Sequence, residues 1–220
     1  MALLHRAELH PTKLELLSLW LPQRPWYQGP AVPDLSRVAS YRFDDPAGEV
    51  GIETMLVQAG PGPLWQAPLT YRAAPLNGHD EWLLGTAEHS VLGRRWIYDG
   101  CADPVYANAL LSTIVTGHGQ AEEFVDIDGQ LQRREASMAV TGSGTASASA
   151  VETIARVVDA DPTVIVTESV ELAVLRVLGE AESDDDGRSA SSRAETGLTL
   201  SGTWDGQAAP MVLARAVLPR

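Results

Sequence analysis

LWLPQRPWYQG, residues Leu19 to Gly29, is the stretch on which the interpretation of this chain depends. It places two of the six tryptophans, a tyrosine, two prolines and an arginine within eleven residues. Exposing so much aromatic surface to water is unfavourable, so these side chains are expected to pack in a core or against another molecule. The candidates for contact with a partner protein or for stacking on a sugar ring are Trp20, Arg24, Trp26 and Tyr27. The interpretation we favour is that they anchor the amino-terminal helix and loop to a sheet.

The residues around this cluster predict a short amphipathic helix. Pro11 or Thr12 is expected to begin it and Pro22 to end it. The segment LELLSLWL, residues 14–21, carries apolar residues at helical spacing. The expected apolar face consists of Leu14, Leu17 and Leu21, widened by Leu16, Leu19 and Trp20.

The residues that follow predict an antiparallel sheet covered by a second helix. Strand-like runs between Arg37 and Tyr98 are separated by short Pro, Gly and Asn turns, which is typical of a meander. Asp103 is a favourable N-cap, Pro104 suits the first helical position, and Gly117 suits the left-handed position after a helix. The apolar face of that helix should lie on the sheet. The predicted fold class is therefore α+β.

The remainder of the chain predicts a second, smaller and mostly-β antiparallel region. A hairpin is expected around Asp128-Gly129, and further strand-like runs follow it. TGSGTASASA, residues 141–150, is small and polar, which indicates a linker or mobile loop. Residues 179–197 contain no large apolar residue and are expected to be disordered. We therefore expect two domains, residues 1–120 and residues 121–220.

Composition restricts the class of protein. The net charge of -13 disfavours nucleic acid and anionic membranes as partners, because both require clustered cations. The chain has neither a run of 18 apolar residues nor a secretory leader pattern. Its single cysteine, Cys101, cannot form an internal disulfide, which agrees with a cytoplasmic setting. Lys13 is the only lysine, so an activity that needs a lysine well inside the chain is excluded.

No pattern in the sequence indicates a catalytic, cofactor or metal site. Asp126 and Asp128 share a strand face and could hold a divalent cation, but an Asp-Gly turn is the simpler interpretation. His89 could act as an acid or base, although a surface histidine is favoured. An enzyme built around His89, Cys101 or Asp126 is the least favoured hypothesis. It requires these three side chains to line one pocket.

The aromatic cluster and the start of the second predicted helix resemble segments of a known family. Trp20-Leu21-Pro22, Arg24 and Trp26-Tyr27-x-Gly29 are similar to the opening of the maltokinase amino-terminal cap, roughly W-L-P-x-x-R-W-[YF]-x-G-K. Tyr98-Asp99, Asp103-Pro104 and the Leu110-Leu111 helix resemble its close, so the resemblance covers roughly residues 12–120. The chain departs from the pattern at Pro25, which is extra, and at Pro30, where the family often has lysine. The resemblance implies a cystatin-like layout, an antiparallel sheet with a helix against it.

The second half resembles, in outline, a degenerate kinase amino-terminal lobe. There a strand carries the lysine that binds the phosphates of ATP, whereas here VELAVLRVLG has Ala173 and Val174 around that position and no lysine. The aspartates of a carboxyl lobe are also missing up to Arg220. Phosphoryl transfer needs lysine, metal and a positioned base together. The expectation is therefore a protein without kinase activity.

Taken together, the preferred hypothesis is a non-catalytic, cytoplasmic accessory or regulatory protein. It would serve α-glucan, maltose or trehalose metabolism through contact with an enzyme such as a maltokinase, a trehalose synthase or a branching enzyme. The alternative is a module that binds a small molecule or an oligosaccharide through Trp26 and Tyr27. Neither hypothesis requires a cofactor, a metal, a nucleic acid or a membrane.

Overall fold

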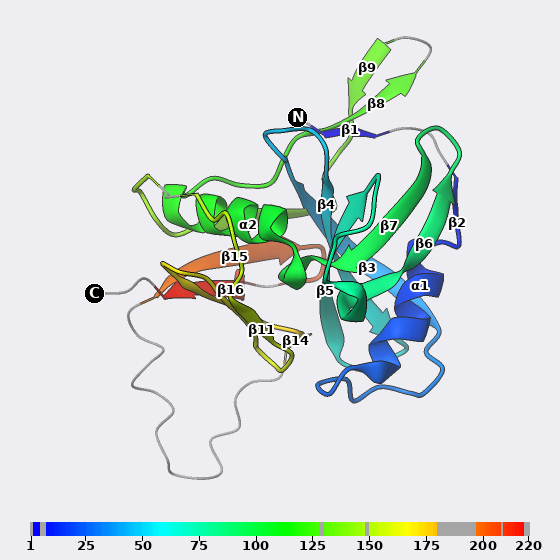
Figure 1. Ribbon diagram of the computed structural model, residues 1–220, viewed down its shortest axis with the longest axis horizontal. Coiled ribbons are helices and arrows are strands. Elements are labelled where there is room, and N and C mark those ends of the chain that lie inside the picture. The colour runs from blue at the N-terminus through cyan, green and yellow to red at the C-terminus, as the bar shows by residue number, and fades with distance from the viewer. Residues whose placement is uncertain are drawn as a thin grey trace.

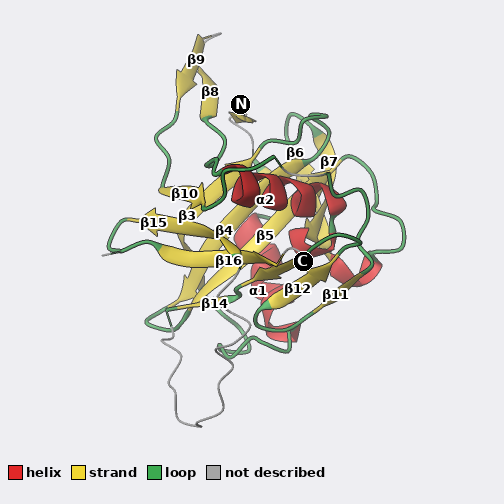
Figure 2. Ribbon diagram, turned by 90° about the vertical axis from the view of Figure 1, so that its left-hand side faces the viewer, coloured by secondary structure: helices red, strands yellow, loops and turns green. Residues whose placement is uncertain are grey.

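The computed structural model describes residues 2–4, 8–127, 130–147, 150–179, 197–207 and 209–217. Over these residues the fold is α+β and consists mostly of antiparallel sheets with few helices (Figures 1 and 2). No helix within these ranges combines the length and the apolar character needed to cross a membrane. The α-helices are α1 (Lys13–Trp20) and α2 (Pro104–Thr116), and the short 3-10 helices are η1 (Leu21–Gln23), η2 (Asp80–Trp82) and η3 (Gly100–Ala102).

A seven-stranded sheet forms the centre of the molecule, in the order β2-β6-β7-β5-β4-β3, with β14 paired to β5. Its strands are β2 (Leu9–His10), β3 (Leu35–Phe43), β4 (Gly51–Ala59), β5 (Leu64–Arg72), β6 (Leu83–His89), β7 (Gly93–Asp99) and β14 (Val177–Leu178). The predicted meander is confirmed for β3 to β5, but β7 rather than β6 lies next to β5. β14 continues the same edge of β5 beyond the end of β7, so the second half of the chain extends the sheet of the first half.

Two further sheets complete the fold. A six-stranded antiparallel sheet has the order β10-β15-β16-β13-β12-β11. Its strands are β10 (Met138–Gly142), β11 (Arg156–Val158), β12 (Thr163–Val166), β13 (Glu171–Val174), β15 (Leu198–Trp204) and β16 (Met211–Val217). The small third sheet contains β1 (Ala2–Leu4), β8 (Glu123–Ile127) and β9 (Gln130–Arg133). β8 and β9 form the predicted hairpin, which projects from the body in Figure 1, and its Asp128-Gly129 turn lies outside the described residues.

The central sheet is buried on both faces. In β4, Met55 and Val57 pack with α1, whereas Ile52 and Leu56 face α2 and the six-stranded sheet. Alternate residues of a strand point to opposite faces, so one strand serves both cores. The core on the α2 side combines residues from both predicted domains, for example Leu56 and Leu213. The ranges 1–120 and 121–220 therefore share one hydrophobic core.

Both helices begin and end where local sequence chemistry places them. The hydroxyl of Thr12 accepts from the N–H of Glu15, and the Glu15 carboxylate accepts from the N–H of Thr12, which is a capping box. The Asp103 carboxylate caps α2, and Gly117 follows it with a left-handed φ of 73°. One detail of the expected α1 face is wrong, because Leu19 is 71% exposed while Leu17 is fully buried.

The segment predicted as a linker at residues 141–150 is partly built into the fold. Thr141 and Gly142 belong to β10, and the N–H groups of Gly144 and Ala146 donate to the last turn of α2. A Cβ atom at Gly142 would collide with the carbonyl oxygen of Thr113. The interpretation as a linker is therefore wrong for residues 141–147, where glycine allows two backbones to approach closely. Residues 148–149 of this segment, and 180–196 of the predicted disordered stretch 179–197, lie outside the described residues.

Candidate site at the junction of the two halves

The aromatic cluster is packed inside the protein. Trp20 and Trp26 are only 4% and 5% exposed, and their rings meet edge to face at a centroid distance of 6.2 Å. The ring of Tyr27 lies 4.7 Å from that of Trp65 on β5. Anchoring of α1 and the following loop to the sheet, the interpretation favoured from the sequence, agrees with this packing. Little surface of either tryptophan is left for stacking on a sugar.

The cluster is also bound to the second half of the chain through a single carboxylate. The indole N–H of Trp26 donates to Oδ1 of Asp159 at 2.7 Å, and Arg24 donates to Oδ2 at 3.3 Å. The guanidinium of Arg24 lies 4.7 Å from the centre of the Trp20 ring. A carboxylate held by two donors of the same loop fixes the position of that loop. Asp159 therefore holds the loop that carries Arg24 and Trp26 in place.

Behind the cluster lies a buried arginine that joins both halves. Arg176 has no exposed surface and donates from Nη2 to Asp99 at 2.5 Å and from Nε to Thr163 at 2.7 Å. Its guanidinium also lies 5.1 Å from the centre of the Trp26 ring. Burial by itself disfavours the charge, but the adjacent Asp99 carboxylate keeps the pKa of Arg176 above its ordinary value. Arg176 is therefore charged and connects β7, η3 and β12 in the interior.

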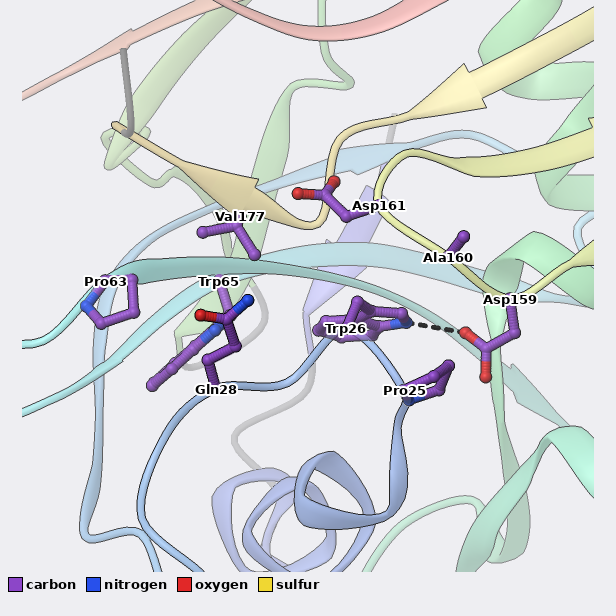
Figure 3. A pocket seen from close by; sticks show the side chains of 9 residues that line it. All are labelled: Pro25, Trp26, Gln28, Pro63, Trp65, Asp159, Ala160, Asp161 and Val177. Carbon is purple, nitrogen blue, oxygen red and sulfur yellow. Dashed lines mark hydrogen bonds between the residues drawn. The ribbon is translucent and has the colours of Figure 1, made fainter. Parts of the chain in front are cut away.

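A cavity of about 260 Å³ opens beside Trp26, between the first and second halves of the chain (Figure 3). Its wall contains two indole rings, two prolines, a valine, an alanine, an amide and two carboxylates. These residues are Pro25, Trp26, Gln28, Pro63, Trp65, Asp159, Ala160, Asp161 and Val177. Asp161 accepts the backbone N–H of Arg176 through Oδ1 at 2.7 Å. The cavity thus combines apolar walls with hydrogen-bonding groups, which is the usual composition of a ligand site.

Of the four residues singled out from the sequence, Trp26 lines this cavity, while Trp20, Arg24 and Tyr27 do not. Sequence reasoning missed Trp65, Asp159 and Asp161. Trp65 lies in a strand-like run and the two aspartates in a polar turn, so each has an ordinary local explanation. Trp26 and Asp159 are 133 positions apart, and no local pattern brings them together.

On the α1 side of the sheet, the only lysine of the chain is engaged in a charged cluster. Lys13, Arg42 and the Tyr71 hydroxyl all donate to Oε2 of the buried Glu53, at 2.5, 2.9 and 2.9 Å. Burial alone would raise the pKa of Glu53, but Arg42 and Lys13 outweigh it and lower the pKa from 4.5 to about 2. Burial lowers the pKa of Lys13, and Glu53 opposes that effect. The cluster fastens α1 to β4 and β3.

Two residues of the enzyme hypothesis, His89 and Cys101, do not share the cavity beside Trp26. Nδ1 of His89 accepts the N–H groups of Val91 and Leu92 in the turn after β6. Cys101 is fully buried, and burial raises its pKa well above the ordinary value. The Asp126 side chain lies outside the described part of the structure. Neither His89 nor Cys101 lines the cavity beside Trp26. No group of three or more metal-binding side chains is found among the described residues.

Antiparallel sheets, two helices on opposite faces of the central sheet and a cavity at the junction place the chain among β-rich α+β proteins. Residues 20–103 match the family model of the maltokinase N-terminal cap domain. This segment is similar to the maltokinase N-terminal cap domain, and the match confirms the resemblance that the aromatic cluster indicated. The match runs from Trp20 at the end of α1 to Asp103, the N-cap of α2. A search of curated proteins found no match to the chain.

Proposed function

We propose that this chain is a non-catalytic accessory or regulatory protein of α-glucan, maltose or trehalose metabolism in the cytoplasm. It acts by contact with an enzyme of that metabolism, such as a maltokinase, a trehalose synthase or a branching enzyme. The observation that carries the proposal is the match of residues 20–103 to the maltokinase cap. We further propose that this segment has the cystatin-like layout of the family, a helix against an antiparallel sheet.

The proposal includes the absence of kinase activity. Its support is the position of Lys13, the only lysine, whose ammonium group is bound to Glu53 on the α1 side of the central sheet. In the kinase lobe that the second half resembles, the strand equivalent to β13 carries a phosphate-binding lysine. Here β13 carries Ala173 and Val174 instead. Phosphoryl transfer depends on a positioned cation at that place. Assay of the purified chain with ATP and maltose is expected to give no phosphorylated sugar.

The contact surface is proposed to lie at the start of the cap-like segment. Val32 and Leu19 are the most exposed large apolar side chains among the described residues, at 90% and 71%. In the sequence they precede and follow the aromatic cluster, whose Trp20 and Trp26 are buried. Apolar side chains that stay exposed favour protein contact, because burying them releases surface water.

Purified maltokinase, trehalose synthase and branching enzyme provide the test. One of them is expected to form a complex with this chain in sedimentation velocity. The double substitution Leu19→Ser and Val32→Ser should weaken that complex about tenfold or more, since hydrophobic anchors dominate interface energies. Leu131→Ser, at a position 51% exposed on β9, is the matched control and should leave it unchanged. Absence of a complex with all three enzymes would refute the proposal.

A further inference from the structure

Strand β14 gives the central sheet an edge that no other described strand covers. It pairs with β5 on one side only, with Val177 opposite Trp65. The N–H of Gln66 donates to the carbonyl oxygen of Arg176 at 2.8 Å, so Val177 and Trp65 form a pair of the non-hydrogen-bonded kind. The N–H and C=O groups of Val177 therefore point away from β5. Because Val177 is partly exposed, these groups can receive a strand from another molecule.

Cavities lie on both faces of this edge. On the α1 face, Val177 and Trp65 line the cavity beside Trp26 (Figure 3). On the α2 face, Leu178 and Leu64 line a second cavity of about 510 Å³. Neighbouring residues of a strand point to opposite faces, so Val177 and Leu178 belong to different cavities. A strand added beside β14 would follow the same alternation and place two consecutive side chains in one cavity each.

The cavity on the α2 face suits an apolar side chain. No charged residue lines it, and its larger side chains include Val38, Leu178, Trp204 and Met211. The side-chain amide of Gln58, which also lines it, already donates to a backbone carbonyl of the β4–β5 turn at 2.6 Å. Burying an apolar group there removes apolar surface from water on both molecules.

The cavity on the α1 face suits a basic side chain. Of its two carboxylates, Asp159 is paired with Arg24, and no cation lines the cavity. Asp161 is exposed and accepts the N–H of Arg176 through Oδ1, and the described residues supply no donor to Oδ2. A lysine or arginine side chain that reaches this cavity from β14 would be attracted by Asp161, whereas an acidic one would be repelled. Because Asp161 is exposed, this attraction is modest.

We propose that β14 binds an extended segment of a partner protein as an added strand, with adjacent basic and apolar side chains in the two cavities. Main-chain hydrogen bonds supply affinity in this binding mode, and the alternating pockets supply specificity. Residues 180–196, which follow β14, contain no large apolar residue, so this part of the chain does not supply the pair. The site goes beyond the proposed function and does not depend on it, because Leu19 and Val32 line neither cavity.

An array of immobilised hexapeptides tests the proposal with the labelled full chain. The outer positions carry threonine, and the two central positions carry every combination of residues. The strongest binding is expected where lysine or arginine stands next to a large apolar residue. No binding to the array, or a preference for acidic or purely polar pairs, would overturn the proposal.

A soluble hexapeptide with a central Arg-Leu pair tests the pairing of the backbones. Its binding should slow hydrogen exchange at the N–H of Val177, measured by NMR on the full chain. Methylation of the peptide nitrogens one at a time should weaken binding at alternate positions, because only every second N–H of a strand faces its neighbour. Equal effects at all positions would contradict strand addition.

Substitutions assign the binding to this edge. Met211→Thr should weaken binding of the Arg-Leu peptide about tenfold by removing apolar contact, with near-UV circular dichroism confirming the fold. Asp161→Asn should weaken it several-fold and remove the preference for a basic residue. Asp205→Asn, at an exposed position that lines neither cavity, is the control and should have no effect. Equal affinity in all three variants would place the peptide elsewhere. Dimerisation in sedimentation velocity that Met211→Thr abolishes would assign the edge to a second copy, and either result refutes the proposal.

Discussion

The two faces of the central sheet are covered by different means. On one face, α1 and the aromatic cluster pack through apolar side chains, with a charged cluster at Glu53 and the Arg24–Asp159 ion pair. On the other face, α2 and the six-stranded sheet share an apolar core. The Arg176–Asp99 pair lies where the two halves of the chain meet, beside Trp26. Both partners of that pair are fully buried, whereas Lys13 in the Glu53 cluster is 29% exposed.

The two kinds of contact contribute differently: apolar packing mainly stabilises the fold, and buried polar pairs mainly select one arrangement of it. Apolar packing stabilises in proportion to the area buried and tolerates small shifts. A buried charge is tolerated only when its partner stands in one place, so it disfavours every other arrangement. Gln66 acts in the same way, because its amide donates to the backbone carbonyls of Leu175 and Leu213 in the second half. We infer that the junction of the two halves is more specifically determined than the apolar packing of α1 on the sheet.

The largest expected effect is at the junction. Arg176→Met leaves the Asp99 carboxylate buried without its cation, so the free energy of unfolding should fall by about 4 kcal/mol. Urea denaturation measures this loss. The double substitution Arg176→Met and Asp99→Asn should recover part of it, since no buried charge remains. Arg94→Met breaks the exposed pair with Glu88 and should change little. An equally small loss for Arg176→Met would remove the distinction between the junction and the α1 packing.

A smaller effect is expected where β10 meets α2. Gly142→Ala places a Cβ against the Thr113 carbonyl oxygen, and the two backbones must separate. The expected loss in the free energy of unfolding is roughly 2 to 3 kcal/mol, within the range for overpacking. Thr145→Ala, at an exposed position of the same segment, serves as the control. Should both substitutions be neutral, residues 141–147 would behave as the flexible linker that the sequence indicates.

The smallest effect concerns the α1 face and depends on pH. The pKa of Glu53 is about 2 in the folded protein and 4.5 ordinarily, so the unfolded chain binds the proton more readily. Its stabilisation is present above about pH 4.5 and is lost as pH falls toward 2. Between pH 7 and pH 3 the loss amounts to roughly 2 kcal/mol. Urea denaturation of the wild type and Glu53→Gln measures it as the difference in pH dependence, and parallel curves would contradict it.

Local chemistry made both helices predictable. The signals that begin and end a helix act within one turn of its ends. They are Thr12 for α1, and Asp103, Pro104 and Gly117 for α2. The strands of the meander were predictable for a similar reason, since alternation and turn residues are local. Leu19 was misjudged because helical spacing cannot say how wide the buried face is. The tertiary structure places α1 on β3 and β6 so that Leu19 points to solvent.

The candidate site was predictable only in part. The density of aromatic residues around Trp26 predicted that its ring is buried. The family resemblance predicted that it belongs to a cap-like segment. The partner of Trp26 is Asp159, and the second indole of the cavity is Trp65 on β5. Periodicity describes one element at a time and carries no information on which elements meet. The small polar segment at Gly142 was misjudged for the same reason, because close backbone approach and flexibility both favour glycine.

By itself, the sequence determined the two helices, the strands of the meander, the α+β class and a cap resemblance over roughly residues 12–120, because capping, alternation and a family motif are properties of neighbouring residues. Only the tertiary structure decided that both halves share one core, that β14 joins β5, and that a cavity lies between Trp26 and Asp161. Those features depend on contacts between distant residues. Such contacts are selected by the burial of whole faces and by the pairing of buried charges.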